Sequence, residues 1–173
     1  MTEPIIVVGT GRCGMSTVAS MLVELGVNMG AGFTSDASNP QGSFEDALIR
    51  DVNRERAEGG HVVCWQGAMQ YIGDERSGSG VPWGWKDPRN ADFMEDIAKL
   101  CPKATYIRCT RDREETLKSF LRWYGWRGGD VVSRRTRNMD RYLPPSTITV
   151  SIEELRIDFD GVRERLRKVV AGA

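Results

Sequence analysis

Short apolar runs alternate with longer mixed segments along this chain. Four of the runs are rich in β-branched or aromatic residues and have the length of buried strands, at positions 5–8, 81–85, 104–109 and 147–151. The segments between them carry apolar residues at helical spacing. Strands that alternate with helices predict an α/β fold of three layers, in which a mostly parallel sheet has helices on both faces.

The helical spacing predicts five helices, each with one apolar face that packs on the sheet. In chain order, these faces consist of Val18, Met21, Leu22 and Leu25; Leu48, Ile49 and Val52; Phe93, Met94, Ile97 and Leu100; Leu117, Phe120, Leu121 and Tyr124; and Val162, Leu166, Val169 and Val170.

Polar residues predict where three of these helices begin. Ser43, followed by Asp46 three residues later, has a pattern like a capping box. Asn90 is expected to cap the next helix. Asp112, with Glu115 three residues later, has a capping pattern directly after the third strand.

Four stretches have weaker patterns. Residues 26–43 are rich in Gly, Ser and Asn and are predicted as a long loop, and long loops in compact domains are often functional. Residues 61–65 fit either a short strand or the end of a buried helix. Residues 73–80 are predicted as a polar loop, and residues 125–141, rich in Gly and Arg, are assigned no element.

The composition is that of a globular protein, and the 173 residues are expected to form one domain, 1–173. With 24 basic and 24 acidic residues the formal net charge is zero, so no global field favours nucleic acid or a membrane surface. No apolar run approaches the length of a membrane span, and the acidic start does not resemble a signal peptide. Four cysteines without C-x-x-C spacing and a single histidine argue against a zinc site and fit the cytoplasm.

The stretch from Gly9 to Thr17 joins the first strand to the first helix. Such a glycine-rich turn points several backbone N–H groups and the positive end of a helix at one place, where a phosphate group can bind. Gly9, Gly14 and Ser16 have the spacing of the P-loop motif G-x-x-x-x-G-K-[ST], but Met15 stands where the lysine is expected. The nearest basic group is Arg12, inside the loop.

Charged residues follow two other strands. Lys86–Arg89 comes after the second strand, and Arg108–Arg111 closes the third. In parallel sheets ligands bind beyond the carboxyl ends of the strands, so these segments and the loop are predicted to meet at one edge.

These segments together resemble the sulfotransferases that use 3′-phosphoadenosine 5′-phosphosulfate (PAPS). Cys13 and Met15 depart from the usual hydroxyl residues of that family's loop, and the long C-terminal loop of some members is not recognisable. The matching segments are Gly11–Ser16, similar to the 5′-phosphosulfate loop; Arg111 with Ser119, similar to the 3′-phosphate motif; Asn39–Asp46, similar to N-P-x-G-x-F-E-D; Trp85–Arg89, similar to the K-D-P-R turn; and, weakly, Ile152–Leu155.

The resemblance implies a sulfotransferase fold and donor-binding roles for the loop. Arg12 would hold the 5′-phosphate and the sulfuryl oxygens, for which a planar and permanently charged group is suited. The alternative is an arginine on an ordinary surface loop. Backbone and hydroxyl donors for the same ligand would come from Gly11, Cys13, Gly14, Met15, Ser16 and Thr17.

Two further groups would act on the transferred sulfuryl. Lys86 would neutralise charge on the leaving oxygen, unless it extends to solvent from the strand end. Glu45 is the candidate general base that takes the acceptor's proton. Asp46 competes for that role, and Glu45 could instead favour the dipole of the following helix. Arg89 could bind substrate or pair with Asp87.

Arg111 and Ser119 would hold the 3′-phosphate. Eight residues on a helix span roughly 12 Å, so this requires the helix to pass beside the nucleotide. The alternative is a capping arginine and an exposed serine. His61 does not match the position of a family base and is interpreted as structural or exposed.

A basic segment follows, with six Lys or Arg residues between positions 118 and 137, among which Trp123, Tyr124 and Trp126 are interleaved. It could be a lid or acceptor site for an anionic or sugar substrate, a nucleic-acid patch, or a solvated helix face.

The sequence thus predicts an enzyme that moves a sulfuryl group from PAPS to a hydroxyl or amine of a small-molecule, sugar or lipid acceptor by in-line transfer, leaving 3′-phosphoadenosine 5′-phosphate (PAP). No metal and no nucleic-acid partner are expected, and a homodimer stays open. The alternatives are a nucleotide kinase or NTPase with a degenerate P-loop, and a non-catalytic nucleotide-binding protein.

Overall fold

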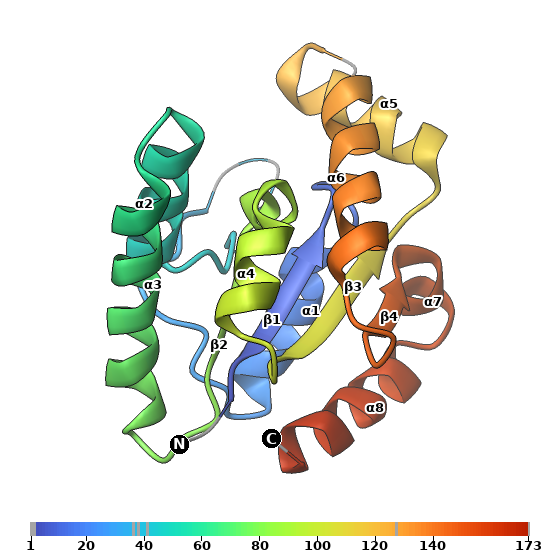
Figure 1. The fold of residues 1–173 in the computed structure, drawn as a ribbon. Helices are drawn as coiled ribbons and strands as arrows, with labels where there is room; N and C mark the ends of the chain where they lie inside the picture. Colours follow the sequence, from blue (N-terminus) through green and yellow to red (C-terminus); the bar gives the residue numbers. More distant parts are fainter. Residues whose placement is uncertain (1–2, 36, 38, 41, 127, 173) are drawn as a thin grey trace.

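A four-stranded parallel sheet forms the centre of the computed structural model, which describes residues 3–172 except 36, 38, 41 and 127. The strand order is β2-β1-β3-β4 (Figure 1). The pairing places Ile6 beside both Trp85 and Tyr106. All four predicted strands are therefore present, as β1 (Ile5–Gly9), β2 (Gly84–Lys86), β3 (Thr105–Thr110) and β4 (Ile148–Ser151).

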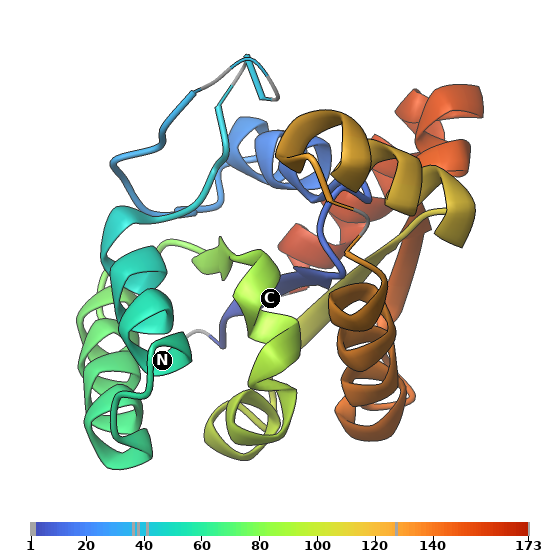
Figure 2. The ribbon, with the colours of Figure 1, turned by 90° about the horizontal axis from the view of Figure 1, so that it is seen from above.

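Helices cover both faces of this sheet. Seen from above, α1, α7 and α8 lie on one side and α3, α4 and α6 on the other (Figure 2). This arrangement confirms the predicted three-layer α/β fold. The helices of the described chain are α1 (Met15–Glu24), α2 (Ala47–Ala57), α3 (Val62–Ser77), the 3₁₀ helix η1 (Pro88–Asp92), α4 (Met94–Leu100), α5 (Arg113–Tyr124), α6 (Gly129–Tyr142), α7 (Ile152–Ile157) and α8 (Phe159–Ala171).

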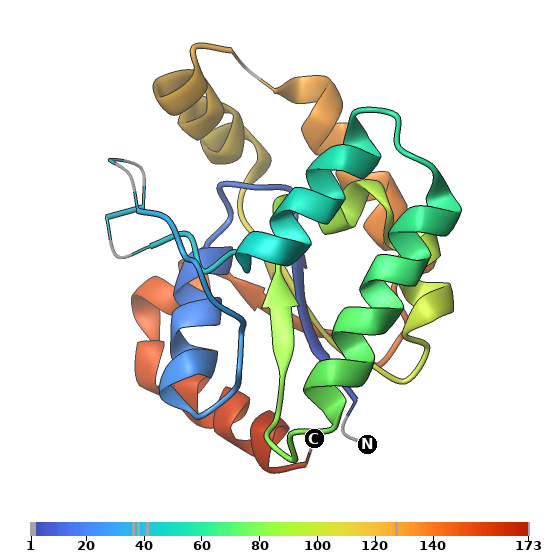
Figure 3. The ribbon, with the colours of Figure 1, turned by 90° about the vertical axis from the view of Figure 1, so that its left-hand side faces the viewer.

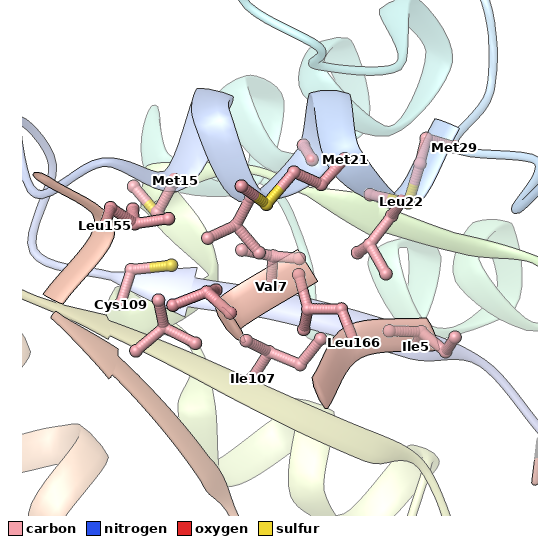
Figure 4. Packing of buried hydrophobic residues seen from close by; sticks show 14 of the residues in the cluster. Ile5, Val7, Met15, Met21, Leu22, Met29, Ile107, Cys109, Leu155 and Leu166 are labelled. Carbon is pink, nitrogen blue, oxygen red and sulfur yellow. The ribbon is translucent and has the colours of Figure 1, made fainter. Parts of the chain in front are cut away.

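The apolar run of β1 is buried on both faces. Ile5 and Val7 belong to a cluster that includes Leu22 of α1 and Leu166 of α8 (Figure 4). Ile6 and Val8 point the other way, into a second cluster formed with α3, α4 and α6. Because both faces of the strand are buried, its sequence is a continuous apolar run and does not alternate between apolar and polar residues.

Two predicted helix starts are wrong. The cap of α2 is Asp46, whose Oδ1 accepts from the Ile49 N–H at 3.0 Å, whereas Ser43 Oγ accepts from the Glu45 N–H in the preceding turn. Asn90 caps nothing, because Pro88 fixes a helical φ and starts η1 two residues earlier. The predicted cap at Asp112 is confirmed by a 2.9 Å bond to its Oδ1 from the Glu115 N–H.

Two helices occupy segments that the sequence left open or assigned to a loop. Residues 61–65 contain the start of α3, which continues through Ser77 and replaces most of the loop predicted over 73–80. Its buried residues Trp65, Met69 and Ile72 have helical spacing, interrupted in the sequence by glycines. Likewise α6 occupies most of 125–141 and buries only Val132 and Met139.

The end of α5 is more exposed than its spacing suggests. Phe120 is buried, but Leu121 and Tyr124 are 47% and 53% exposed, so their predicted burial is wrong. The reason is that α5 rises beyond the carboxyl edge of the sheet and has no sheet surface beneath its end (Figure 1).

The long connection from α1 to α2 runs beside the β2 edge of the sheet (Figure 3). Asn28 forms an isolated parallel bridge with Trp83 there. The Ala47 N–H then donates to the Ala31 carbonyl, which ties the connection to the start of α2. Gln41 of the matching N-P-x-G stretch lies outside the described residues. Nowhere in the described chain does a helix have the length and apolar character needed to cross a membrane.

Candidate active site

The loop between β1 and α1 has the backbone of an anion cradle. Gly11 and Gly14 have φ of 94° and 88°, values that L side chains rarely adopt. No side chain caps the α1 N-terminus at Gly14, and the residues of its first turn, Gly14 to Thr17, line the pocket described below. Arg12 has φ 58°, and Phe44, next to Glu45, has φ 53°. These are the two non-glycine residues with positive φ in the described chain, and strained backbone concentrates at functional sites.

The two unusual loop residues point downward, into the core. Cys13 and Met15 are 1% and 3% exposed and belong to the buried cluster that includes Leu155. Figure 4 shows Met15 among these side chains. Burial raises the pKa of the Cys13 thiol, which makes it a poor nucleophile. A Cβ on Gly9 would lie 2.5 Å from the Cys13 sulfur, so this glycine makes room for the buried side chain.

Lys86 brings a cation to the loop from the neighbouring strand. It is 4% exposed, and its Nζ donates to Glu45 Oε1 at 2.7 Å and to the Ser43 carbonyl at 2.9 Å. It also lies 3.4 Å from Ser16 Oγ. The ammonium group therefore joins β2, the turn before α2 and the first turn of α1, although the loop has no lysine of its own.

Each of the two residues proposed for a 3′-phosphate contacts Arg12 of the loop. Arg12 Nε donates to Ser119 Oγ at 3.1 Å, and Arg111 Nη1 donates to the Arg12 carbonyl at 3.2 Å. The Arg12 guanidinium lies 5.6 Å from the centre of the Trp123 ring. The loop arginine thus lies between the start of α5 and its third turn.

A pocket of about 580 Å³ opens over these groups. Residues from the loop, the turn before α2, β2, η1, α5, α6 and α7 line it. Cys13 and Ser119 do not line it. The predicted site residues in its wall are Gly11, Arg12, Gly14, Met15, Ser16, Thr17, Glu45, Lys86 and Arg111.

Sequence reasoning did not assign several wall residues. Arg135 was visible only as one member of a basic segment, and Phe120 and Tyr124 only as an apolar helix face. Nothing in the sequence indicated where Trp126 and Val131 lie, because their positions depend on how the chain turns from α5 into α6. Arg127 of the same segment lies outside the described residues.

The competing acidic and histidine candidates have other positions. Asp46 is 4% exposed, caps α2 and pairs with Arg76 Nη2 at 2.8 Å. His61 borders a separate cavity of about 50 Å³ at the start of α3. Of these three predicted candidates, Glu45 is the one that faces the main pocket.

Asp87 is fully buried below the pocket. Its carboxylate accepts from Asn53 Nδ2 at 3.1 Å and from the Arg89 N–H at 2.8 Å, and burial raises its pKa. It serves as the cap of η1. Within the described residues, no group of three or more His, Cys, Asp or Glu side chains is arranged to hold a metal ion.

No family model matches this sequence, and no curated protein matches it either. Solved structures do match its fold. The sulfotransferase domain of the Synechococcus PCC 7002 olefin synthase superposes with a TM-score of 0.63 at 15% identity, over 99% of this chain and 74% of that one. The chain has a sulfotransferase fold.

Two more solved sulfotransferase structures have the same fold as this chain. The sulfotransferase domain of the curacin biosynthetic pathway has a TM-score of 0.60 at 13% identity, over 96% of this chain and 72% of that domain. A sulfotransferase from Mycobacterium tuberculosis H37Rv has a TM-score of 0.55 at 13% identity, over 99% and 68%. The fold expected from the sequence resemblance is thereby confirmed.

Proposed function

We propose that this chain is a sulfotransferase that moves the sulfuryl group of PAPS to a hydroxyl or amine acceptor. One observation carries the proposal. Three cationic side chains, Arg12, Lys86 and Arg111, line one pocket with a glycine-rich loop whose helix N-terminus has no side-chain cap. A donor with phosphate at two positions and a sulfuryl group between loop and acceptor fits this distribution of charge.

The donor half of the pocket is formed by the loop and the start of α5. The N–H groups of Gly14, Met15 and Ser16 would bind the 5′-phosphate, and Arg12 would bridge it to the sulfuryl oxygens. Arg111 and Ser119 would hold the 3′-phosphate, and the Arg12–Ser119 bond supports this because it shows that loop and helix are in contact.

The transfer is an in-line displacement. A bond forms between the acceptor oxygen or nitrogen and sulfur, while the bond from sulfur to the bridging phosphate oxygen breaks and its electron pair leaves with PAP. Glu45 takes the proton of the acceptor. Lys86 stabilises the charge that grows on the bridging oxygen, in a wall where its 4% exposure excludes most water.

The geometry opposes the kinase alternative. The motif lysine is replaced by Met15, which is buried. Asp87, the candidate metal-binding carboxylate, is fully buried and engaged with Asn53 and the start of η1.

Thermal unfolding with PAP, and in parallel with ATP and magnesium, tests the donor class. A ligand at a hundred times its Kd stabilises by about 2.7 kcal/mol, which raises the midpoint of a domain of this size by about 5–10 °C. We expect this shift with PAP. A shift of the unfolding midpoint with ATP and magnesium alone would contradict the proposal and favour a nucleotide kinase or NTPase. Binding of PAP without transfer of labelled sulfate from PAPS to any acceptor of a hydroxyl and amine panel would favour the non-catalytic alternative.

A further inference from the structure

Two arginines of the pocket remain without a role in donor binding. Arg89 comes from η1 and Arg135 from α6, and both line the same cavity as Lys86 and Glu45. The two elements pack on each other, since Asn138 Nδ2 of α6 donates to the Ala91 carbonyl of η1 at 3.0 Å. The pocket therefore holds two more guanidinium groups than the proposed donor contacts use.

Arg135 is held in a fixed position. Its Nε and Nη2 donate to Asp92 Oδ2 at 3.0 and 2.7 Å, and its Nη1 donates to the Thr10 carbonyl at 2.9 Å. These partners use three of the five N–H groups that a guanidinium carries. The side chain is 12% exposed and lines the pocket, and its Nη1 lies beside Gly11.

Arg89 is held more loosely. Its Nη1 is 3.5 Å from Asp87 Oδ1, and within the described part of the chain no other carboxylate lies within 4 Å of its side-chain nitrogens. That carboxylate already accepts from the Arg89 N–H and from Asn53. At 33% exposure the guanidinium can bind a ligand without first leaving a strong ion pair.

The wall between these arginines and the end of α5 is largely apolar. Phe120 packs against both Tyr124 and Trp126, with ring centres 5.6 Å apart in each pair. Pro88 and Val131 complete this side. Among the described lining residues Glu45 is the one carboxylate, against five Lys or Arg side chains. An uncharged acceptor would satisfy the aromatic wall but would take out of water those N–H groups of Arg89 and Arg135 that Asp87, Asp92 and the Thr10 carbonyl do not use, which is unfavourable.

We infer that the acceptor carries an anionic group (a carboxylate, phosphate or sulfate ester) that Arg89 and Arg135 bind, joined through an apolar or aromatic part to the hydroxyl or amine that reaches Glu45. This inference rests on the proposed function, because it takes the loop side of the pocket as the donor half. The two arginines set the distance between the anionic group and the reacting atom, so they determine acceptor specificity.

The test uses the full chain saturated with PAP, so that the donor half is filled. Two matched probe pairs are titrated by tryptophan fluorescence and calorimetry: 4-hydroxyphenylacetate against 4-hydroxyphenylacetamide, and 2-(4-hydroxyphenyl)ethyl phosphate against 2-(4-hydroxyphenyl)ethanol. A hydrogen bond to a charged group contributes about 1.5–3 kcal/mol, so the anionic member of at least one pair should bind about tenfold or more tightly than its neutral partner. Arg89→Gln and Arg135→Gln should each remove most of that preference. The matched control is Arg122→Gln, an exposed arginine of α5 outside the pocket wall.

The possible results distinguish failure of the proposed function from failure of the anionic-acceptor inference. Absence of PAP binding overturns the proposed function itself. If PAP binds but neither anionic probe is preferred, or if the preference survives in both arginine variants, the anionic-acceptor inference is overturned while the proposed function stands. It is also overturned if Arg89→Gln and Arg135→Gln weaken PAP as strongly as they weaken the probes, because the arginines would then belong to the donor half. Among the described residues Arg89 has no hydrogen bond or ion pair to the loop, so its variant provides the test if Arg135→Gln does not fold.

Discussion

Replacing Asp46 with alanine should destabilise the chain far more than any exposed carboxylate does. Its Oδ1 caps α2 through the Ile49 N–H, and its Oδ2 accepts from the Ala31 N–H at 2.9 Å and from Arg76 Nη2 at 2.8 Å. The side chain is 4% exposed and that of Arg76 is 15% exposed. One carboxylate therefore ties the long connection, α2 and α3 to the turn that holds Glu45.

The magnitude follows from these contacts. Loss of an N-cap costs about 1 kcal/mol, and loss of one charged hydrogen bond in a shielded pair costs about 1.5–3 kcal/mol. We expect Asp46→Ala to lower the free energy of unfolding by about 2.5–4 kcal/mol, or the midpoint by roughly 5–16 °C, since about 1 kcal/mol shifts a domain of this size by 2–4 °C.

The free energy of unfolding is measured by urea unfolding, followed by circular dichroism, for the variants Asp46→Ala and Arg76→Gln and for the double variant. Because the partners are in contact, the double variant should be more stable than additivity predicts by about 1–2 kcal/mol. Glu95→Ala is the matched control, since Glu95 pairs with Lys99 on an exposed helix face and should cost about 0.5 kcal/mol or less. A cost for Asp46→Ala no greater than for Glu95→Ala would refute the argument that this carboxylate holds the site together.

Three further predictions follow from the site. Lys86→Met should abolish sulfate transfer from PAPS while the circular dichroism spectrum stays that of the parent chain, and undiminished transfer would remove Lys86 from the mechanism. Arg111→Gln should weaken PAP about tenfold or more and leave adenosine 5′-monophosphate nearly unchanged, because it loses one charged contact to the 3′-phosphate; equal losses in calorimetry would contradict that assignment. Iodoacetamide at pH 8, read by mass spectrometry, should modify exposed Cys64 first. Burial raises the pKa of Cys101 to about 11, so its thiolate is scarce at pH 8 and it should react more slowly, and the buried Cys13 and Cys109 should react only in urea. Rapid labelling of Cys109 in the native chain would show that the cluster beneath the loop opens.

Local sequence patterns were sufficient to predict the strands of the sheet and the glycine-rich loop after β1. The β1 run and the glycines after it carry their information within a dozen residues, and so does the cap at Asp112. The parallel-sheet rule then predicts correctly that Lys86 and Arg111 reach the same edge.

The sequence-based predictions that were wrong or missing concern residues whose positions depend on contacts between distant segments. Tyr124 has the spacing of a buried residue, but its exposure depends on how far α5 extends beyond the sheet. The position of Arg135 depends on the packing of α6 against η1, which brings it to a carbonyl 125 residues earlier in the chain. The helix α6 itself could not be predicted, because it buries only two residues and the segment before it contains glycines.

The direction of the Met15 side chain limits how this chain could change its chemistry. In a P-loop NTPase the same position would offer a lysine to the phosphates. Here it packs under the loop with Cys13, in a cluster closed by Leu155. A Met15→Lys substitution would place an ammonium group among apolar side chains, where desolvation opposes its charge. A single substitution therefore does not lead from this loop to a nucleoside triphosphatase, and an evolutionary path between the two chemistries would have to repack the core before it gained the lysine.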